Sequence, residues 1–178
     1  MNSFLLTPCC PLEIAELSAS LNDKTSYGID EIPLTYLKKC IDPLTTIISL
    51  LVNNSFQTGH FPDELKIAKV CPIFKAGDKS FASNYRPISV LSSLSKIFEK
   101  AIYVRLDKYI ATKNILIKNQ YGFRTGHSTY MALLDLCDNI TKNIEKKLVT
   151  VGVFIDLQKA FDSLDHSILL GKLKYCGI

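Results

Sequence analysis

The chain has 178 residues, of which 47% are apolar, and this is enough to build a folded domain around a hydrophobic core. It contains no run of 18 apolar residues, and residues 1–12 lack the basic start of a secretory signal. We therefore expect no signal peptide, no transmembrane segment and no membrane partner, and a location inside the cell, in the cytoplasm or nucleus.

The charge is distributed unevenly along the chain. Residues 1–65 hold 3 Lys/Arg and 8 Asp/Glu, residues 66–124 hold 12 and 3, and residues 125–178 hold 6 and 6. The central block therefore carries a net charge of +9. A block this basic favours a polyanion partner, because phosphates attract Lys and Arg and release counterions on binding. The alternative is a solvated helical face, on which lysine is common.

Six cysteines are spread along the chain without a C-x-x-C pair. We therefore expect buried thiols in a reducing compartment, with no disulfide partner and no metal cluster. These residues are Cys9, Cys10, Cys40, Cys71, Cys137 and Cys176.

The N-terminal third is predicted to be helical. Apolar residues at helical spacing indicate a helix over residues 11–24. Pro33 suits the first turn of a second, short helix. A third helix, from about Leu44 to Phe56, is expected to end at Gly59, which can adopt the left-handed conformation of a helix C-terminus.

A pair of strands is predicted next. Residues 67–74 alternate in the manner of a strand, and residues 75–78 have the composition of a turn. Residues 84–89 are extended, because the residue before a proline avoids the helical region. Ser92 or Ser93 is expected to cap the long helix that follows.

The remainder is predicted to be a polar loop over residues 112–127, a helix opened by Ser128, a buried strand over residues 149–155 and a last helix over about 163–175. The order of helices, a strand pair, helices and a strand indicates an α+β or mixed α/β fold.

Asp156 directly follows the apolar, β-branched run of residues 149–155. A strand there would deliver the carboxylate to the edge of a sheet, where ligand sites of open α/β sheets lie, and Mg²⁺ prefers such oxygen ligands. The alternative is a strand-end aspartate that caps the next helix. A D-x-D phosphatase signature is absent because residue 158 is Gln, and there is no G-x-x-x-x-G-K-[ST] run. Asp162 is interpreted as a structural acceptor or helix-start residue.

Basic side chains flank the predicted turn between the two strands. Lys75 and Arg86 are placed so that Arg can clamp a triphosphate with two hydrogen bonds and Lys can act as a point charge. The segment Gly122-Phe123-Arg124-x-Gly126 could bring backbone close to a phosphate chain. The alternatives are surface basic residues and an ordinary glycine-rich turn.

Four segments occur in a specific order: Lys75-Ala-Gly-Asp78, Asn84-Tyr-Arg-Pro-Ile-Ser89, Gln120-Tyr-Gly-Phe-Arg-x-Gly-x-Ser-Thr129 and Phe154-Ile-Asp-Leu-Gln-Lys-Ala-Phe-Asp162. Together they resemble the reverse transcriptase domain of non-LTR retrotransposons of the jockey-like kind. Two upstream segments, Gly28 to Pro33 and Gly59 to Asp63, are similar to the extra N-terminal polymerase block of that family. The resemblance covers about residues 11–178.

The resemblance implies an α+β fold that comprises the fingers and the first part of the palm of a right-hand polymerase, and is incomplete. Residues 1–65 would be an N-terminal helical extension of the polymerase, and residues 66–147 a fingers-like region. Residues 148–178 would begin the palm and carry the first catalytic aspartate. The implied function is that of an RNA-directed DNA polymerase, which adds dNTP to a primer.

The resemblance also assigns roles to individual residues. Asp156 would be the first catalytic aspartate and would bind Mg²⁺ together with the carbonyl group of Leu157. Lys75 and Arg86 would grip the dNTP triphosphate, and Phe161 would be the steric gate beneath the incoming sugar. The path of the RNA template and DNA primer would be lined by Gln120, Gly122, Phe123, Arg124 and Gly126.

The sequence departs from the family in one respect: it lacks the paired aspartates of the Ala/Tyr-x-Asp-Asp strand. We therefore expect that the 178-residue polypeptide does not polymerise DNA alone, and that it binds Mg²⁺ weakly or not at all. A catalytically dead retroelement remnant that only binds nucleic acid, and an unrelated α+β interaction protein, remain as alternatives. Because a lone strand is only marginally stable, we also expect exposed apolar surface around residues 149–155 and some aggregation.

Overall fold

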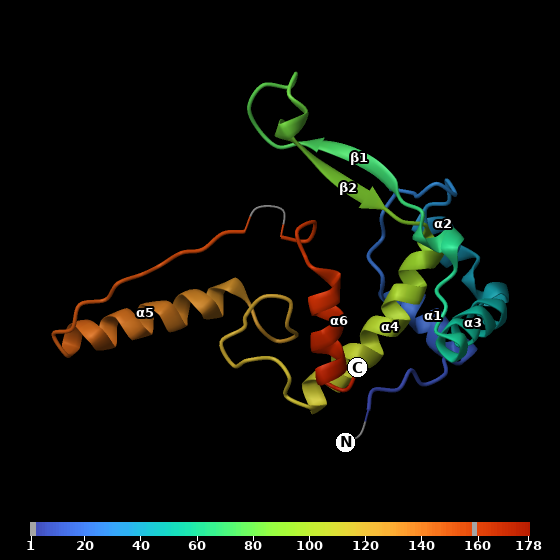
Figure 1. Ribbon diagram of the computed structural model, residues 1–178. Coiled ribbons are helices and arrows are strands. Elements are labelled where there is room, and N and C mark those ends of the chain that lie inside the picture. The colour runs from blue at the N-terminus through green and yellow to red at the C-terminus, as the bar shows by residue number, and fades with distance from the viewer. Residues whose placement is uncertain (1–2, 158–159) are drawn as a thin grey trace. The chain divides into compact units, whose positions relative to one another are not determined.

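The computed structural model describes residues 3–157 and 160–178, which form two compact units (Figure 1). One unit is Phe4–Tyr109, and the other is formed by Ile110–Ile178 together with the N-terminal end of the chain.

The first unit is built around four helices. They bury one apolar cluster that includes Ile14, Ile48 and Phe98, each at most 4% exposed. The helix predicted over residues 11–24 ends earlier, because the backbone becomes extended at Leu21. Gly59 ends the third helix in the left-handed conformation (φ 68°), as predicted. The four helices are α1 (Pro11–Ser20), α2 (Leu34–Lys39), α3 (Ile41–Thr58) and α4 (Ser93–Thr112), the last of which runs three residues past the end of this unit.

Arg105 of α4 fastens the N-terminal segment to this core. Its guanidinium group donates to both carboxylate oxygens of Glu13 at 2.8 and 3.0 Å. It also donates to the carbonyl oxygens of Thr7 (2.6 Å) and Pro8 (3.1 Å). One planar side chain therefore joins α4, α1 and the chain that precedes α1, which is a task that suits the fork geometry of Arg.

Buried serines at the start of α4 connect it to two distant segments. The hydroxyl oxygen of Ser92 accepts from the backbone N–H of Ser95 (3.0 Å), so Ser92 is the cap. Ser93 donates to the carbonyl oxygen of Ile32 (2.8 Å), and Ser95 donates to that of Leu65 (2.9 Å). These bonds tie the start of α4, which follows the strand pair, to the chain before α2 and to the segment that leads into the strand pair.

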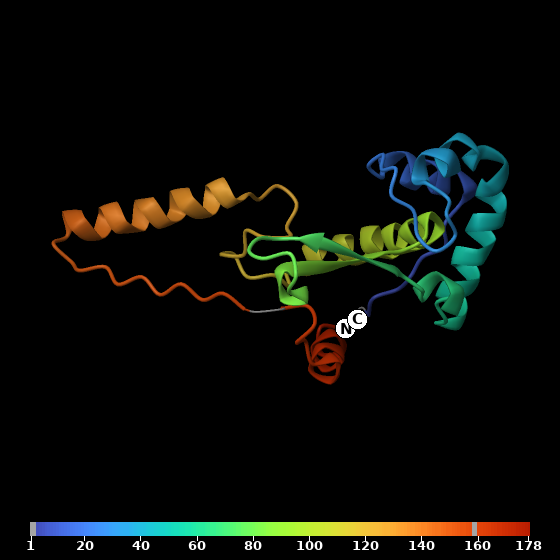
Figure 2. The ribbon, with the colours of Figure 1, turned by 90° about the horizontal axis from the view of Figure 1, so that it is seen from above.

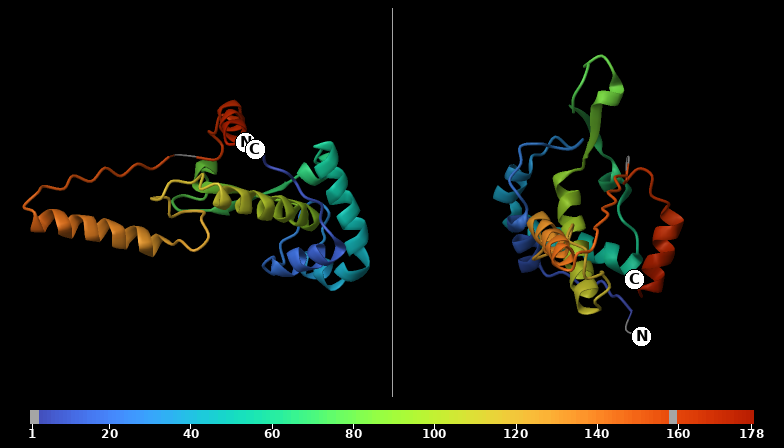
Figure 3. Two further views of the ribbon diagram at one scale, coloured as in Figure 1. Left: turned by 90° about the horizontal axis from the view of Figure 1, so that it is seen from below. Right: turned by 90° about the vertical axis from the view of Figure 1, so that its left-hand side faces the viewer.

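The predicted strand pair is present as an antiparallel hairpin of β1 (Lys69–Phe74) and β2 (Tyr85–Val90). A short 3₁₀ turn, η1 (Asp63–Lys66), precedes the hairpin, and another, η2 (Ala82–Asn84), lies in the connection between the two strands. Figures 1 and 3 show the hairpin extending away from the helices of its own unit. Every residue of both strands is therefore exposed or half-buried.

Proline interrupts both outer edges of the hairpin. The backbone N–H of Lys75 donates to the carbonyl oxygen of Asn84 (2.8 Å), so hydrogen bonds alternate from that pair along the ladder. By this alternation, the backbone nitrogen atoms of the directly paired Pro72 and Pro87 point away from the partner strand, toward the two outer edges of the hairpin. Because proline has no N–H, neither edge offers a continuous row of donors to another strand.

The second unit contains α5 (Thr129–Glu145) and α6 (His166–Tyr175). Ser128 caps α5 by accepting from the N–H of Met131 (3.3 Å), as predicted. The expected start of the last helix near residue 163 and the proposed helix-start role of Asp162 are wrong. The cap is Asp165, whose carboxylate accepts from the N–H groups of Ser167 (2.8 Å) and Ile168 (3.2 Å).

The buried strand predicted over residues 149–155 does not form within the part of the chain that the structure describes. Figure 2 shows this segment as an extended trace after α5, without a ladder partner. Val149, Val153 and Phe154 are 91%, 80% and 86% exposed. A β-branched run needs a neighbouring strand to satisfy its backbone, so the exposed apolar surface expected here is confirmed.

The expectation of buried thiols holds for Cys9 alone. Burial raises the pKa of the Cys9 thiol to about 11, an effect that the nearby Arg105 partly opposes. Cys10, Cys40 and Cys137 are exposed free thiols, and Cys71 is half-buried.

Candidate nucleotide and nucleic-acid site

The hairpin places the two predicted triphosphate ligands on one face of the sheet. Arg86 pairs with Ile73, which lies two residues before Lys75 and therefore points to the same side. Lys75 and Arg86 are thus diagonal neighbours across the ladder, a relation in which side chains start about 7–8 Å apart. Both are exposed. This face presents two adjacent cations to solvent, as an anion site requires.

The turn between the strands is held by its own hydrogen bonds. The Asn84 side chain donates to the carbonyl oxygen of Asp78 (2.7 Å), and the Asp78 carboxylate accepts from the N–H of Ser80 (2.9 Å). These bonds from Ser80 hold the pKa of Asp78 below its ordinary value. Gly77 has a φ of +92°, and a Cβ there would lie 2.8 Å from the Asn84 amide nitrogen.

Gly77, Asp78 and Asn84 therefore set the path of the chain between Lys75 and Arg86. The sequence predicts a turn over residues 75–78, which include Gly77 and Asp78, but gives Asn84 no role in closing it, although all three residues lie within the motif segments. Their fixed spacing was the available signal, because a glycine–aspartate turn closed by an asparagine six residues later satisfies its polar groups locally.

The predicted template–primer segment forms a loop before α5 in the second unit. The Gln120 side chain donates to the carbonyl oxygen of Gly122 (3.2 Å), and Arg124 donates to that of Ile117 (3.1 Å). The Tyr121 hydroxyl donates to the Asp135 carboxylate of α5. Part of the donor capacity of Gln120 and Arg124 is therefore used to hold the loop.

The two glycines of this loop differ in whether the backbone requires a residue without a side chain. Gly126 adopts a φ of +75°, which suits a residue without a side chain. A Cβ at Gly122 would meet nothing within 4 Å. The described structure does not itself require glycine at position 122, so its bare backbone is open to an approaching ligand.

The structure brings together two predicted residues that the sequence left separate. The rings of Phe123 and Phe161 meet edge to face, with centroids 6.4 Å apart at 86°. They remain 93% and 81% exposed. Phe123 also has a φ of +56°, which is uncommon for an aromatic residue. The pair forms an exposed aromatic corner beside the loop.

Asp156 and Leu157 lie at the end of the extended segment in the second unit, and both are exposed. A carboxylate and a carbonyl oxygen are the right kind of ligand for Mg²⁺, which is commonly held by one or two carboxylates with phosphates and water. Within residues 3–157 and 160–178, no group of three or more His, Cys, Asp or Glu side chains gathers as a metal site. Gln158 and Lys159 of the same motif lie outside the described residues.

The candidate residues are thus divided between the units. Lys75 and Arg86 belong to the first unit, while Asp156, Phe161 and the 120–126 loop belong to the second.

The family model described as reverse transcriptase (RNA-dependent DNA polymerase) matches residues 73–178. This is more than half of the chain, and the protein therefore belongs to the reverse transcriptase family. Within it, the chain carries part of the reverse transcriptase domain of non-LTR retrotransposons, and the interpretation as an unrelated interaction protein has no support.

Similar proteins include RNA-directed DNA polymerases, two of them described as probable, of mobile elements of Drosophila melanogaster. The chain is 37% identical over 163 residues to a probable RNA-directed DNA polymerase from transposon BS, covering 91% of this chain and 18% of that protein. It is 33% identical over 163 residues to the RNA-directed DNA polymerase from mobile element jockey, with coverage of 91% and 18%. For the probable polymerase from transposon X-element the identity is 32% over 170 residues, with coverage of 95% and 19%. The chain thus spans less than a fifth of the length of these relatives.

The helices in the described part of the chain include none with the length and apolar character needed to cross a bilayer.

Proposed function

We propose that this chain supplies the nucleotide-binding fingers and the first metal-binding aspartate of an RNA-directed DNA polymerase of a non-LTR retrotransposon. The observation that carries the proposal is the exposed placement of Lys75 and Arg86 on one face of a hairpin whose turn is fixed by its own hydrogen bonds. The β1–β2 hairpin would belong to the fingers, and the palm would begin near residue 148.

On this proposal the hairpin binds the triphosphate of a dNTP. Arg86 has a planar guanidinium group that can donate two parallel hydrogen bonds to phosphate oxygens, and Lys75 adds a point charge beside it. Ile73 and Ile88 continue the same face and are 54% and 45% exposed. They would offer apolar contact to the rest of the nucleotide.

The second unit carries the other residues to which the family resemblance gives a role. Asp156 and the carbonyl group of Leu157 would hold Mg²⁺. When bound, that ion polarises phosphate oxygens and neutralises charge during nucleotidyl transfer. Phe161, steadied by the edge of Phe123, would lie beneath the sugar of the incoming nucleotide. The open backbone at Gly122 would approach the sugar–phosphate chain of the template and primer.

Nucleotide binding by the 178-residue protein tests the role of the hairpin. A fluorescent dNTP analogue should bind, and Lys75→Ala and Arg86→Ala should each weaken its binding by about tenfold or more, since a hydrogen bond to a charged group contributes roughly 1.5–3 kcal/mol. Arg86→Lys should recover only part of the loss, because it keeps the charge and loses the fork. Lys24→Ala is the control, as it removes an exposed lysine outside the hairpin. Equal losses in the control and the hairpin variants would sink the proposal.

Metal binding tests the role of Asp156. Mn²⁺ is a spectroscopic substitute for Mg²⁺, and its electron paramagnetic resonance signal reports the bound fraction in the presence of dNTP. Asp156→Asn should weaken the Mn²⁺–dNTP complex severalfold, while Asp162→Asn should leave it unchanged. If the two variants behave alike, Asp156 has no special part in holding the metal.

A further inference from the structure

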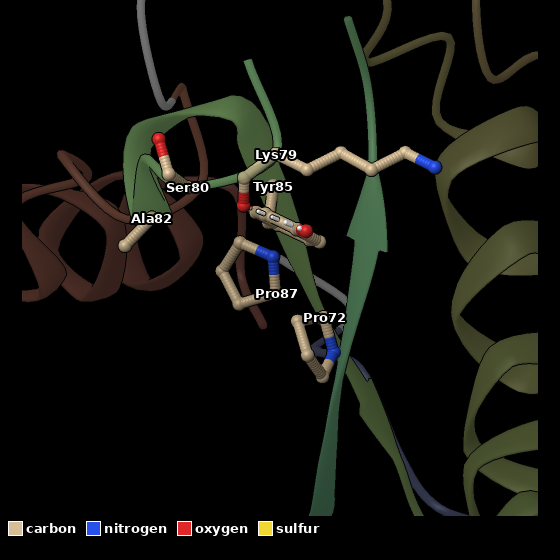
Figure 4. A pocket seen from close by; sticks show the side chains of 6 residues that line it. All are labelled: Pro72, Lys79, Ser80, Ala82, Tyr85 and Pro87. Atoms are coloured by element: carbon tan, nitrogen blue, oxygen red, sulfur yellow. Dashed lines mark hydrogen bonds between the residues drawn. The ribbon is translucent and has the colours of Figure 1, made fainter.

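The face of the hairpin opposite Lys75 and Arg86 is hollowed. A shallow cavity of about 400 Å³ opens between the two strands and the turn (Figure 4). It belongs to the first unit alone. Its lining residues are Pro72, Lys79, Ser80, Ala82, Tyr85 and Pro87.

The aromatic wall of this cavity is held rigidly. The Tyr85 ring meets the Phe74 ring edge to face, with centroids 5.5 Å apart at 63°. The Tyr85 hydroxyl donates to the carbonyl oxygen of Lys79 (3.0 Å). In Figure 4 the Tyr85 ring lies between the two prolines and the Lys79–Ser80 segment. A ring fixed at both ends is a preorganised surface for a flat ligand, because little side-chain entropy remains to be lost.

A lysine lies beside the Phe74–Tyr85 ring pair. The Lys79 ammonium group lies 5.6 Å from the centre of the Phe74 ring. The hairpin, residues 69–90, holds four Lys/Arg and a single acidic residue, Asp78, whose carboxylate already accepts from Ser80. Among the described residues, Lys79 is the one Lys or Arg side chain that lines the cavity, and no carboxylate lines it, which favours an anionic group beside the occupant of the cavity.

The strand edges argue against an added peptide strand. Pro72 and Pro87 occupy the outward-facing position in the middle of each edge, where a docking peptide would need an N–H donor. The remaining features, a fixed aromatic ring with a lysine beside it, are those by which proteins bind single-stranded nucleic acid without reading its sequence.

We propose that this cavity binds an unpaired base of a single-stranded nucleic acid. The base stacks on Tyr85 between the prolines, and Lys79 pairs with the adjoining phosphate. The inference rests on the proposed function only because a reverse transcriptase copies a single-stranded nucleic acid. The site itself lies on the face of the hairpin that does not carry Lys75 and Arg86.

The test uses the 178-residue protein and a short oligonucleotide that contains the fluorescent base 2-aminopurine. Stacking should quench the fluorescence of the base on binding. Tyr85→Ala should weaken binding about tenfold and abolish the quenching, whereas Tyr85→Phe should retain the quenching and most of the binding, because it keeps the ring and loses only the bond from its hydroxyl to Lys79. Lys79→Gln should weaken binding severalfold and lower its salt dependence by about one phosphate contact. Circular dichroism of each variant checks that the fold is intact.

Binding and quenching that survive in Tyr85→Ala would overturn the proposal and leave the cavity to a protein partner. The dNTP titration separates this result from a failure of the proposed function. Loss of dNTP binding in Arg86→Ala together with unchanged quenching in Tyr85→Ala would reject the base site alone. Unchanged dNTP binding in Arg86→Ala together with loss of quenching in Tyr85→Ala would support the base site and reject the nucleotide site.

Discussion

The segments at residues 69–90 and 149–155 carry the same kind of β-forming sequence but have different structures. In the first, two short strands pair across a turn that closes with bonds among Asp78, Ser80 and Asn84. In the second, five apolar side chains of a seven-residue run are at least 80% exposed, and the described residues form no ladder there. The comparison teaches that β propensity becomes a strand only where the chain also supplies a partner.

The two segments also differ in how they are fastened. The hairpin belongs to a unit whose core is formed by α1, α3 and α4. Ser93 and Ser95 at the start of α4 hydrogen-bond to the chain near the end of the hairpin where it joins the helices. Residues 148–157 have one side-chain bond of this kind, from Asn143 to the hydroxyl of Thr150 (3.1 Å).

The largest expected effect contrasts two phenylalanines. Phe98 is fully buried against Phe61, with ring centroids 5.8 Å apart, whereas Phe154 is 86% exposed. Phe98→Ala should lower the free energy of unfolding by about 3–5 kcal/mol, because it leaves a cavity. Phe154→Ala should change it by less than about 0.5 kcal/mol. Urea denaturation of the two variants measures both values, and similar losses would show that residues 149–155 are packed after all.

The next effect concerns the base of the hairpin. A Cβ at Gly28 would lie 2.7 Å from the backbone nitrogen of Ser92 and 2.8 Å from the carbonyl carbon of Leu91. Gly28→Ala should therefore cost about 1–3 kcal/mol, as overpacking against backbone usually does. Gly122→Ala is the matched control, since its Cβ would meet nothing within 4 Å. Thermal unfolding distinguishes the two, and an unchanged midpoint for Gly28→Ala would contradict the close approach.

Features that depend on local chemistry could be predicted from the sequence. The cap at Ser128, the left-handed end of α3 at Gly59 and the turn after β1 all follow from residues within one helical turn or one hairpin. The placement of Lys75 and Arg86 on one face also follows from strand alternation once the register is known.

Features that depend on distant or competing partners could not be predicted. The bonds from Ser93 to Ile32 and from Ser95 to Leu65 span 61 and 30 residues, so no local pattern reveals them. Asp162 and Asp165 are both plausible caps for α6, and only the helix start decides between them. The cavity beside Tyr85 needs the register that places Pro72 opposite Pro87.

A smaller effect is expected from pH. The pKa of the buried Cys9 thiol is raised from 9.0 to about 11, so the folded state favours the neutral form. The contribution of Cys9 to the free energy of unfolding is therefore fully present below pH 9. It falls above pH 9, as the thiol ionises in the unfolded chain, and is gone above pH 11, a loss of about 1–3 kcal/mol in total. Cys9→Ala should be less stable at pH 7 but should lack this component. Urea denaturation from pH 8 to 11 checks the difference between the two curves, and parallel curves would contradict it.

The smallest change in stability is expected from substitutions in the exposed run of residues 149–155, which should instead change the association of chains with one another. Val151 and Val153 are 83% and 80% exposed, so replacing either with Lys removes apolar surface from solvent contact without disturbing a core. Val153→Lys should leave the unfolding midpoint unchanged and should reduce concentration-dependent light scattering, because a charge in an exposed β-forming run opposes strand pairing between chains. Thr125→Lys adds the same charge at an exposed polar position of the same unit. If both variants reduce scattering equally, net charge and not the exposed run controls association.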